Sequence, residues 1–232
     1  MGQCGPGVQA VTISLLQQLR QVFGAVRAVL FDFDGPLCDV FAGLPARGIA
    51  RQLEAIVERR YPTDDPLEVL SLSSQLGADT VSVVESALIR AELDAVARAK
   101  PNSEGLTAVQ ACLSAGLEVG VVSNNSGEAV TAFLKSAGLV QYIAPIVGRE
   151  PGRPDLMKPN PWPLQQALTS LACRPEDAVF IGDSTTDIDV ANALGVHIVA
   201  YANKPGKRQR FTDAGAIVID SMSELVAAVS PA

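Results

Sequence analysis

Histidine is the scarcest chemically active residue in this chain. His197 is the only histidine among 232 residues. Zinc sites rich in histidine, and nucleophiles activated by a histidine base, need imidazoles that the chain does not have. Any chemistry must therefore use carboxylates, hydroxyls, lysine or a hard metal ion.

Cysteines and long apolar runs are also few. The chain has four cysteines, and none of them forms a Cys-x-x-Cys pair: Cys4, Cys38, Cys112 and Cys173. This spacing argues against a zinc knuckle or a redox dithiol and favours reduced thiols. There is no run of about 18 consecutive apolar residues and no signal-peptide pattern. The first residues begin like a myristoylation signal but have Pro6 where serine or threonine is required. We therefore expect a cytoplasmic protein that does not bind membranes.

Basic residues are outnumbered by acidic ones. The chain has 18 Lys+Arg and 25 Asp+Glu, which gives a formal charge of −7 that is spread along the sequence. This balance argues against electrostatic binding of nucleic acid or anionic lipid. We expect a small solute as the partner and a monomer or homodimer as the assembly. With 48% hydrophobic residues, the chain is long enough for one domain that carries a smaller inserted one.

Short apolar runs alternate with helical segments over most of the chain. Strands are predicted at residues 28–33, 117–123, 142–147, 178–181 and 196–201, with a weaker one at 216–219. Helices are predicted at 8–23, 106–115, 127–137, 161–171, 185–194 and 223–229. This alternation predicts an α/β fold with a doubly wound, mainly parallel sheet covered by helices on both faces. In such sheets the ligand crevice lies at the carboxyl ends of the strands.

One segment interrupts the alternation. Residues 38–102 contain no convincing strand, but helical patterns at 49–60 and 81–100 are joined by a turn-rich stretch at 61–66. The segment is too long for an ordinary connection of about 2–6 residues. We expect residues 38–102 to form a helical cap domain over the sheet edge, and residues 1–37 and 103–232 to form the core domain.

Polar residues follow three of the predicted strands. Asp32 and Asp34 follow the first predicted strand, and Ser123 and Asn124 end the second. Asp183 and Asp187 follow the fourth strand, and Lys158 lies in the loop and helix region before it. Carboxylates that lie close together raise the cost of ionising one another, and a divalent cation removes this conflict. Oxygen donors and carboxylates are typical of Mg²⁺ sites. Lysine and serine suit the oxygens of a phosphoryl group, so the pattern predicts Mg²⁺ and a phosphate ester.

The same residues resemble the four motifs of a known family. Asp32-Phe33-Asp34-Gly35, Ser123, Lys158, and Gly182-Asp183 with Asp187 occur in the order found in the haloacid dehalogenase superfamily of phosphotransferases. The resemblance runs from about Ala28 to Ala228. The helical segment matches the C1-type cap of its phosphoglycolate phosphatase-like members.

This resemblance implies catalytic and metal-binding roles. Asp32 would be the nucleophile that forms an aspartyl-phosphate, and it would also bind Mg²⁺. Asp34 would be the general acid and base, with its backbone carbonyl on the metal. Asp183 would be the third ligand of the metal ion. Asp187 would be a carboxylate next to these ligands that does not itself bind the metal.

Phosphate binding is implied in the same way. Ser123 and the Asn124 amide would bind phosphoryl oxygens, and Lys158 would neutralise charge between the nucleophile and the phosphate. Arg47 and Arg51 are candidates to contact the leaving group from the cap, and a solvated helix face is the alternative interpretation. The only basic run is interpreted as a surface loop and helix start, and consists of Lys204, Lys207, Arg208 and Arg210.

Two positions need separate comment. Pro36 stands where the family usually has threonine or valine, and it removes one backbone N–H from the turn. Asp189 is a second acidic residue close to Asp187. The two would lie about 200° apart on a helix, so only one can face the site, and the spacing favours Asp187.

Three functions compete. The first is a Mg²⁺-dependent phosphatase acting on a small phosphorylated metabolite, and the second is a phosphomutase of the same superfamily with identical core residues. From another class, a phospho-receiver or binding protein also gathers aspartates, a hydroxyl and a lysine around Mg²⁺. That third reading does not explain the insert of about 65 residues. A dehalogenase is disfavoured because it would lack Asp34.

Overall fold

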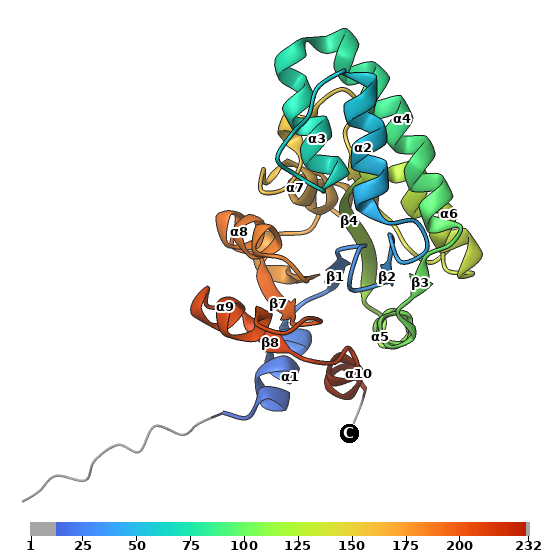
Figure 1. The fold of residues 1–232 in the computed structure, drawn as a ribbon. Helices are drawn as coiled ribbons and strands as arrows, with labels where there is room; N and C mark the ends of the chain where they lie inside the picture. The colour runs from blue at the N-terminus through green and yellow to red at the C-terminus, as the bar shows by residue number, and fades with distance from the viewer. Residues whose placement is uncertain (1–12, 231–232) are drawn as a thin grey trace, which may run out of the picture.

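A six-stranded parallel sheet forms the centre of the chain in the computed structural model, which describes residues 13–230 (Figure 1). The strand order is β5-β4-β1-β6-β7-β8, and all neighbouring strands in this sheet are parallel. The strands are β1 (Ala28–Phe31), β4 (Glu118–Ser126), β5 (Ile146–Arg149), β6 (Ala178–Gly182), β7 (His197–Tyr201) and β8 (Ile217–Ile219). The predicted α/β fold is confirmed.

Helices cover both faces of this sheet. Along β1, Val29 and Phe31 point to one hydrophobic cluster, while Ala28 and Leu30 point to another. Burial on both faces explains why β1 is a continuous apolar run. The first face is covered by α1 (Leu15–Ala25), α5 (Ser103–Ser114), α6 (Gly127–Ser136) and α10 (Ser223–Val229). The second is covered by α7 (Trp162–Ser170), α8 (Thr185–Leu194) and α9 (Lys207–Asp213).

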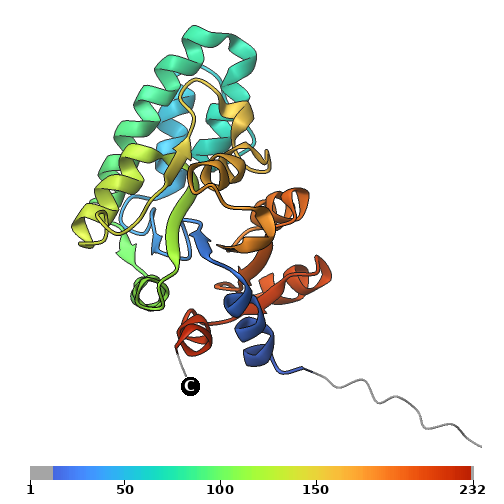
Figure 2. The same ribbon diagram turned by 180° about the vertical axis from the view of Figure 1, so that it is seen from behind.

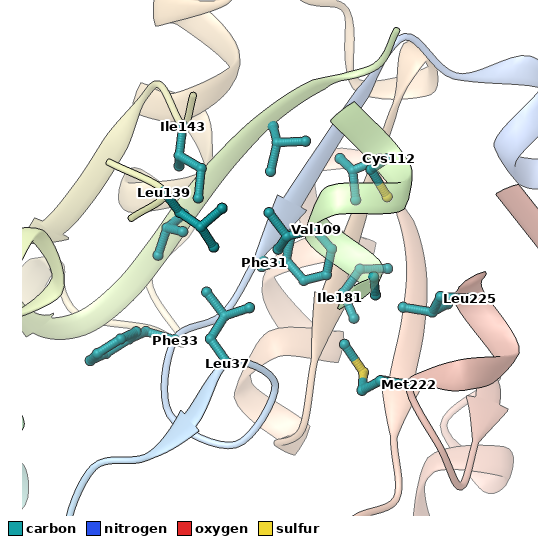
Figure 3. Packing of buried hydrophobic residues seen from close by; sticks show 14 of the residues in the cluster. Phe31, Phe33, Leu37, Val109, Cys112, Leu139, Ile143, Ile181, Met222 and Leu225 are labelled. Carbon is teal, nitrogen blue, oxygen red and sulfur yellow. The ribbon is translucent and has the colours of Figure 1, made fainter. Parts of the chain in front are cut away.

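The first face contains the largest cluster. Phe31 is fully buried and lies among side chains of α5, β6 and the start of α10 (Figure 3). Full burial of such a side chain stabilises the fold by about 1.5–3 kcal/mol. This cluster holds the helices against the sheet and so stabilises the edge where the carboxyl ends of the strands lie.

Residues 38–102 are mainly helical, as their pattern predicts. They contain α2 (Ala46–Ile56), α3 (Pro66–Ser73) and α4 (Ala78–Val96), and these helices lie together at one end of the molecule (Figures 1 and 2). They share a separate hydrophobic cluster that includes Leu53, Leu70 and Leu88. The division of the chain into a core and a cap domain stays a prediction.

Two details of this segment differ from the sequence prediction. Residues 38–102 do contain strands, because β2 (Cys38–Asp39) and β3 (Lys100–Pro101) form a short antiparallel ribbon. Helix α3 was not predicted. It begins at Pro66, a residue suited to the first turn, and Asp65 caps it by accepting a hydrogen bond from the Leu67 N–H at 2.9 Å. The start of α3 was therefore not recognised, because it lies at the end of the turn-rich stretch at residues 61–66.

The N-terminal helix is shorter in the described part of the chain than its pattern predicts. α1 begins at Leu15, after a capping box between Ser14 and Gln17. The predicted start at Val8 lies outside the described residues, as do Cys4 and Pro6. Within residues 13–230, no helix is both long and apolar enough to cross a membrane.

A buried ionic cluster joins α4 to the sheet. The Arg149 guanidinium has no exposed surface and donates to Glu85 at 2.6 Å and to Glu92 at 2.9 Å. Arg149 lies at the end of β5, whereas both glutamates lie on α4. We call these three residues the Arg149 cluster. Because each charge has lost its water, each depends on its partners.

Replacing Arg149 with methionine should leave Glu85 and Glu92 buried without a counter-charge. We expect Arg149→Met to lower the free energy of unfolding by about 3–5 kcal/mol, the usual cost of breaking a buried pair, as measured by urea denaturation at pH 7. Arg174→Met is the control, because Arg174 pairs with Glu176 and Asp177 on the exposed surface. Equal losses in the two variants would contradict the prediction.

Acid should weaken the helical segment through Glu54. Hydrogen bonds from Arg51 and the Tyr61 N–H, aided by Arg60, lower the pKa of Glu54 from 4.5 to about 2. Since the folded-state pKa is depressed, the stabilisation is complete above 4.5 and is lost as pH falls towards about 2. Glu54→Gln should melt at a lower temperature than wild type at pH 6. The difference should shrink as pH falls, as followed by thermal melts; a difference that does not vary with pH would refute this origin.

Candidate active site

The carboxyl ends of the strands surround a pocket of about 760 Å³. Parallel strands bring their carboxyl ends to one edge, so residues distant in sequence can meet there. Six of the predicted site residues line this pocket: Asp32, Asp34, Ser123, Asn124, Lys158 and Asp183. The site therefore draws on the loops that follow β1 and β6, on the carboxyl-terminal part of β4, and on the loop before α7.

Lys158 provides the positive charge at the bottom of the pocket. Its Nζ donates to Asp32 Oδ1 at 2.8 Å and to Asp187 Oδ1 at 2.6 Å, and the side chain is only 4% exposed. Burial lowers the pKa of Lys158, but Asp187 and Asp32 outweigh burial and raise it above its ordinary value. The ammonium group therefore stays protonated between two carboxylates.

Asp32 and Asp34 lie in different electrostatic surroundings. Burial raises the pKa of Asp32, and the charge of Lys158 opposes that rise. Burial also raises the pKa of Asp34 to about 6, while a hydrogen bond from the Val40 N–H to Asp34 Oδ1 at 2.9 Å works against it. Two carboxylates separated by one residue thus differ in their readiness to carry a proton.

Asp187 is fully buried at the start of α8. Its Oδ2 accepts hydrogen bonds from the Asp183 N–H, the Ser184 N–H and the Ser184 hydroxyl, at 2.6–3.1 Å. Ser184 caps the helix in return. Asp189 is exposed, so of the two candidates on this helix the structure brings Asp187 to the site.

Asp183 is held by two residues that the sequence analysis did not select. Its Oδ2 accepts a hydrogen bond from Asn203 Nδ2 at 2.8 Å and from Lys207 Nζ at 2.7 Å. Lys207 was predicted to lie in a surface basic run, and no sequence motif indicates Asn203. Both residues follow the carboxyl end of β7, and that position is the signal that could have identified them.

The carboxylates of Asp32, Asp183 and Asp187 suit a divalent metal. One oxygen from each lies within 4.8 Å of the others, and hard cations such as Mg²⁺ prefer such donors. The predicted set was Asp32, Asp34 and Asp183, with Asp34 contributing its backbone carbonyl. Both oxygens of Asp187 already bind Lys158 and the start of α8, so Asp32 and Asp183 are the better placed donors.

Ser123 and Asn124 lie where β4 leaves its regular pairing with β5. The Ser123 hydroxyl accepts a hydrogen bond from the Asn125 N–H at 3.0 Å. The Asn124 side chain accepts from the Lys158 N–H at 2.8 Å and donates to the Lys158 carbonyl at 3.1 Å. Asn124 therefore fixes the backbone that carries the Lys158 ammonium.

Pro36 leaves the turn after Asp34 closed. The Gly35 N–H donates to the Cys38 carbonyl at 2.7 Å, and the Leu37 N–H donates to the Phe33 carbonyl at 3.2 Å. Neither bond needs an N–H at residue 36, so the turn is compatible with proline.

The structure does not bring Arg47 and Arg51 to the pocket. Both guanidinium groups pair with Asp64, and Arg51 also pairs with Glu54. Helix α3 faces the pocket instead, through residues that carry no recognisable motif: Asp65, Leu67, Glu68 and Ser71. The pairing of the arginines within the helical segment supports the solvated-face alternative.

Two glycines make room for the site. A Cβ on Gly35 would lie 2.5 Å from Asp183 Cγ, and one on Gly182 would lie 2.4 Å from Asp187 Cβ. Gly35 also has φ +106°, a region that favours glycine. The carboxylates can approach the backbone only where a side chain is missing.

Comparisons of sequence agree with these features. The model of the haloacid dehalogenase-like hydrolase family matches residues 29–201. Phosphoglycolate phosphatase of Rhodospirillum rubrum is 28% identical over 200 residues, which cover 77% of this chain and 82% of the relative. Phosphoglycolate phosphatase of Yersinia pseudotuberculosis is 32% identical over 196 residues, which cover 75% and 79% respectively.

Comparisons of structure show the same fold. A haloacid dehalogenase-like family hydrolase from Streptococcus pneumoniae superimposes with a TM-score of 0.65 at 18% identity, over 88% of this chain and 98% of that one. CbbY from Rhodobacter sphaeroides, solved in complex with phosphate, has a TM-score of 0.65 at 18% identity and covers 86% and 96%. At this identity the likeness concerns the fold alone.

Alanine at Gly35 should lower the stability more than alanine at a glycine with a similar φ angle. Gly77 has φ +101° and nothing within 4 Å of an added Cβ, so Gly77→Ala should lower the free energy of unfolding only by backbone strain of about 1–3 kcal/mol. Gly35→Ala adds the clash with Asp183 and should cost more in urea denaturation. Equal losses would mean that the close approach to Asp183 carries no constraint.

Proposed function

The chain belongs to the haloacid dehalogenase-like hydrolase family and is a phosphatase, and we propose that it hydrolyses small phosphate monoesters with Mg²⁺ through an aspartyl-phosphate on Asp32. The observation that carries this proposal is the ion pair at the bottom of the pocket. There the Asp32 carboxylate lies 2.8 Å from the Lys158 ammonium, with the Ser123 hydroxyl lining the same pocket. A nucleophile, a cation and a hydrogen-bond donor thus converge on one space.

Ser123, Asn124 and Lys158 would bind the phosphoryl group. The Ser123 hydroxyl and the Asn124 backbone N–H would donate to phosphoryl oxygens. The Lys158 ammonium would reduce the repulsion between the Asp32 carboxylate and the phosphate. Because the charge in the transition state is spread over the phosphoryl oxygens, fixed positive groups supply most of the catalysis.

Asp32 and Asp183 would hold the metal, together with the backbone carbonyl of Asp34. When bound, a divalent cation supplies positive charge that lowers the repulsion between an attacking carboxylate and a phosphate. Asn203 and Lys207 bind Asp183 Oδ2, so they would orient Asp183 with its other oxygen towards the site.

Asp32 and Asp34 would divide the chemistry between them. A carboxylate oxygen of Asp32 attacks phosphorus, the bond from phosphorus to the leaving oxygen breaks, and Asp34 donates a proton to the departing alcohol. Asp34 then takes a proton from water, the water oxygen attacks phosphorus, and Asp32 is released with inorganic phosphate. Covalent catalysis in this form replaces one difficult displacement by two easier ones.

A phosphomutase would use the same core residues and would return the phosphoryl group to the substrate. Release of inorganic phosphate distinguishes the two outcomes. We favour hydrolysis because the sequence relatives described above carry the name of a phosphatase.

Turnover of 4-nitrophenyl phosphate with Mg²⁺ tests the mechanism. Asp32→Asn should lower kcat by at least about a thousandfold because the nucleophile is lost. Asp34→Asn should lower kcat by about 10²–10⁴-fold because proton transfer is lost. Asp189→Asn, on the exposed side of α8, should keep wild-type activity, and a metal chelator should abolish it. Turnover without a metal ion, or turnover that persists in Asp32→Asn, would contradict the proposal.

A further inference from the structure

The outer wall of the pocket is acidic. Helix α3 contributes Glu68, and Asp65 caps its N-terminus. The short helix η2 (Pro154–Leu156), which packs against α3, contributes Asp155. These residues line the pocket beyond the aspartates of the strand ends. They therefore face the space that the leaving group of a phosphate ester would occupy.

Positive charge in the pocket is confined to its inner end. Lys158 is the one cation among the pocket-lining residues in the described part of the chain. Its ammonium already binds Asp32 and Asp187, and its side chain is 4% exposed. It is committed to the reacting phosphate and is not available to a charge on the leaving group.

The three outer carboxylates are not equally neutralised. Arg153 binds Asp155 through two hydrogen bonds, at 2.9 Å and 2.7 Å. Asp65 and Glu68 form no ion pair within residues 13–230, and the Asp65 carboxylate accepts only from the start of α3. Two negative charges without an ion pair, one on α3 and one at its N-cap, thus remain next to the leaving group.

We propose that these charges select the substrate: the pocket favours phosphate monoesters whose leaving group bears hydroxyl or ammonium groups, and rejects those whose leaving group bears a carboxylate. This inference rests on the proposed phosphatase function and names the substrate class of the same site. It separates this chain from what the name of its relatives suggests, because phosphoglycolate carries a carboxylate. Asp65 and Glu68 are the residues that determine the selection, with Glu68 the more important because Asp65 is also engaged as a helix cap.

The physical basis is repulsion between like charges in a partly enclosed space. At the effective dielectric constant near a protein surface, one unit charge several ångströms away changes binding by about tenfold. Salt screens this effect over about 10 Å at 0.1 M ionic strength, so the selection should be strongest at low ionic strength.

Three two-carbon phosphate esters of similar size test the proposal: O-phosphoethanolamine, 2-hydroxyethyl phosphate and phosphoglycolate. Each is added as a competitor during turnover of 4-nitrophenyl phosphate at low ionic strength. We expect the ammonium and hydroxyl esters to compete at least about tenfold more effectively than phosphoglycolate. Phosphoglycolate competing as well as or better than 2-hydroxyethyl phosphate overturns the proposal, and so does undetectable competition by all three.

Reversal of the charge on α3 identifies the residue responsible. Glu68→Lys should raise the effectiveness of phosphoglycolate relative to 2-hydroxyethyl phosphate by about tenfold or more. The matched control is Asp94→Lys, which makes the same charge change at an exposed position of α4 outside the pocket; it should leave the ratio unchanged. Equal ratios in the two variants would overturn the assignment to Glu68.

Failure of the proposed function gives a separate result. In that case 4-nitrophenyl phosphate itself is not hydrolysed by the wild-type protein with Mg²⁺. Hydrolysis of that ester together with strong competition by phosphoglycolate would leave the phosphatase function intact and remove only the inference about charge.

Discussion

The salt bridge of Lys158 with Asp32 and Asp187 is the interaction on which the site depends. It links the loop that carries Lys158 to the end of β1 and to the start of α8. Lys158 is 126 residues from Asp32 and 29 residues from Asp187 in sequence. None of the three side chains is more than 10% exposed. Burial penalises every unpaired charge, so the two carboxylates and the ammonium group depend on one another. The positions of β1, α8 and the Lys158 loop are therefore mutually dependent, and Asn124 extends that dependence to β4.

Site residues could be predicted from the sequence where their position follows from the direction of the strands. Asp32 and Asp183 each follow a buried strand, and Ser123 lies near the carboxyl end of another. Parallel strands must bring such residues to one edge. The period of a helix showed that only one of Asp187 and Asp189 could face the site, and the spacing favoured Asp187. Neither inference required knowledge of a contact between distant residues. The superfamily motifs added roles to residues whose position was already implied by the strands.

Other parts of the site could not be predicted, because they depend on packing between segments far apart in the chain. Arg149 binds glutamates 57 and 64 residues away, and nothing in the local pattern of β5 indicates this. Lys207 was predicted to be one of several basic surface residues, whereas in the structure it binds Asp183. Helix α3 was hidden by its proline-rich start, and with it the residues that face the leaving group. Chemistry thus follows from short motifs, whereas selectivity depends on side chains that belong to no motif.

The short ribbon of β2 and β3 has an evolutionary consequence. Since the strands that enter and leave the helical segment are paired with each other, that segment occupies a single loop position of the sheet. Loops at such positions can lengthen, shorten or be exchanged between lineages without any change in strand order. In this protein such an exchange would be constrained, because α4 carries Glu85 and Glu92, the carboxylates that pair with Arg149. A lineage that replaced the helices would have to change Arg149 in the same period, so the two should vary together among descendants.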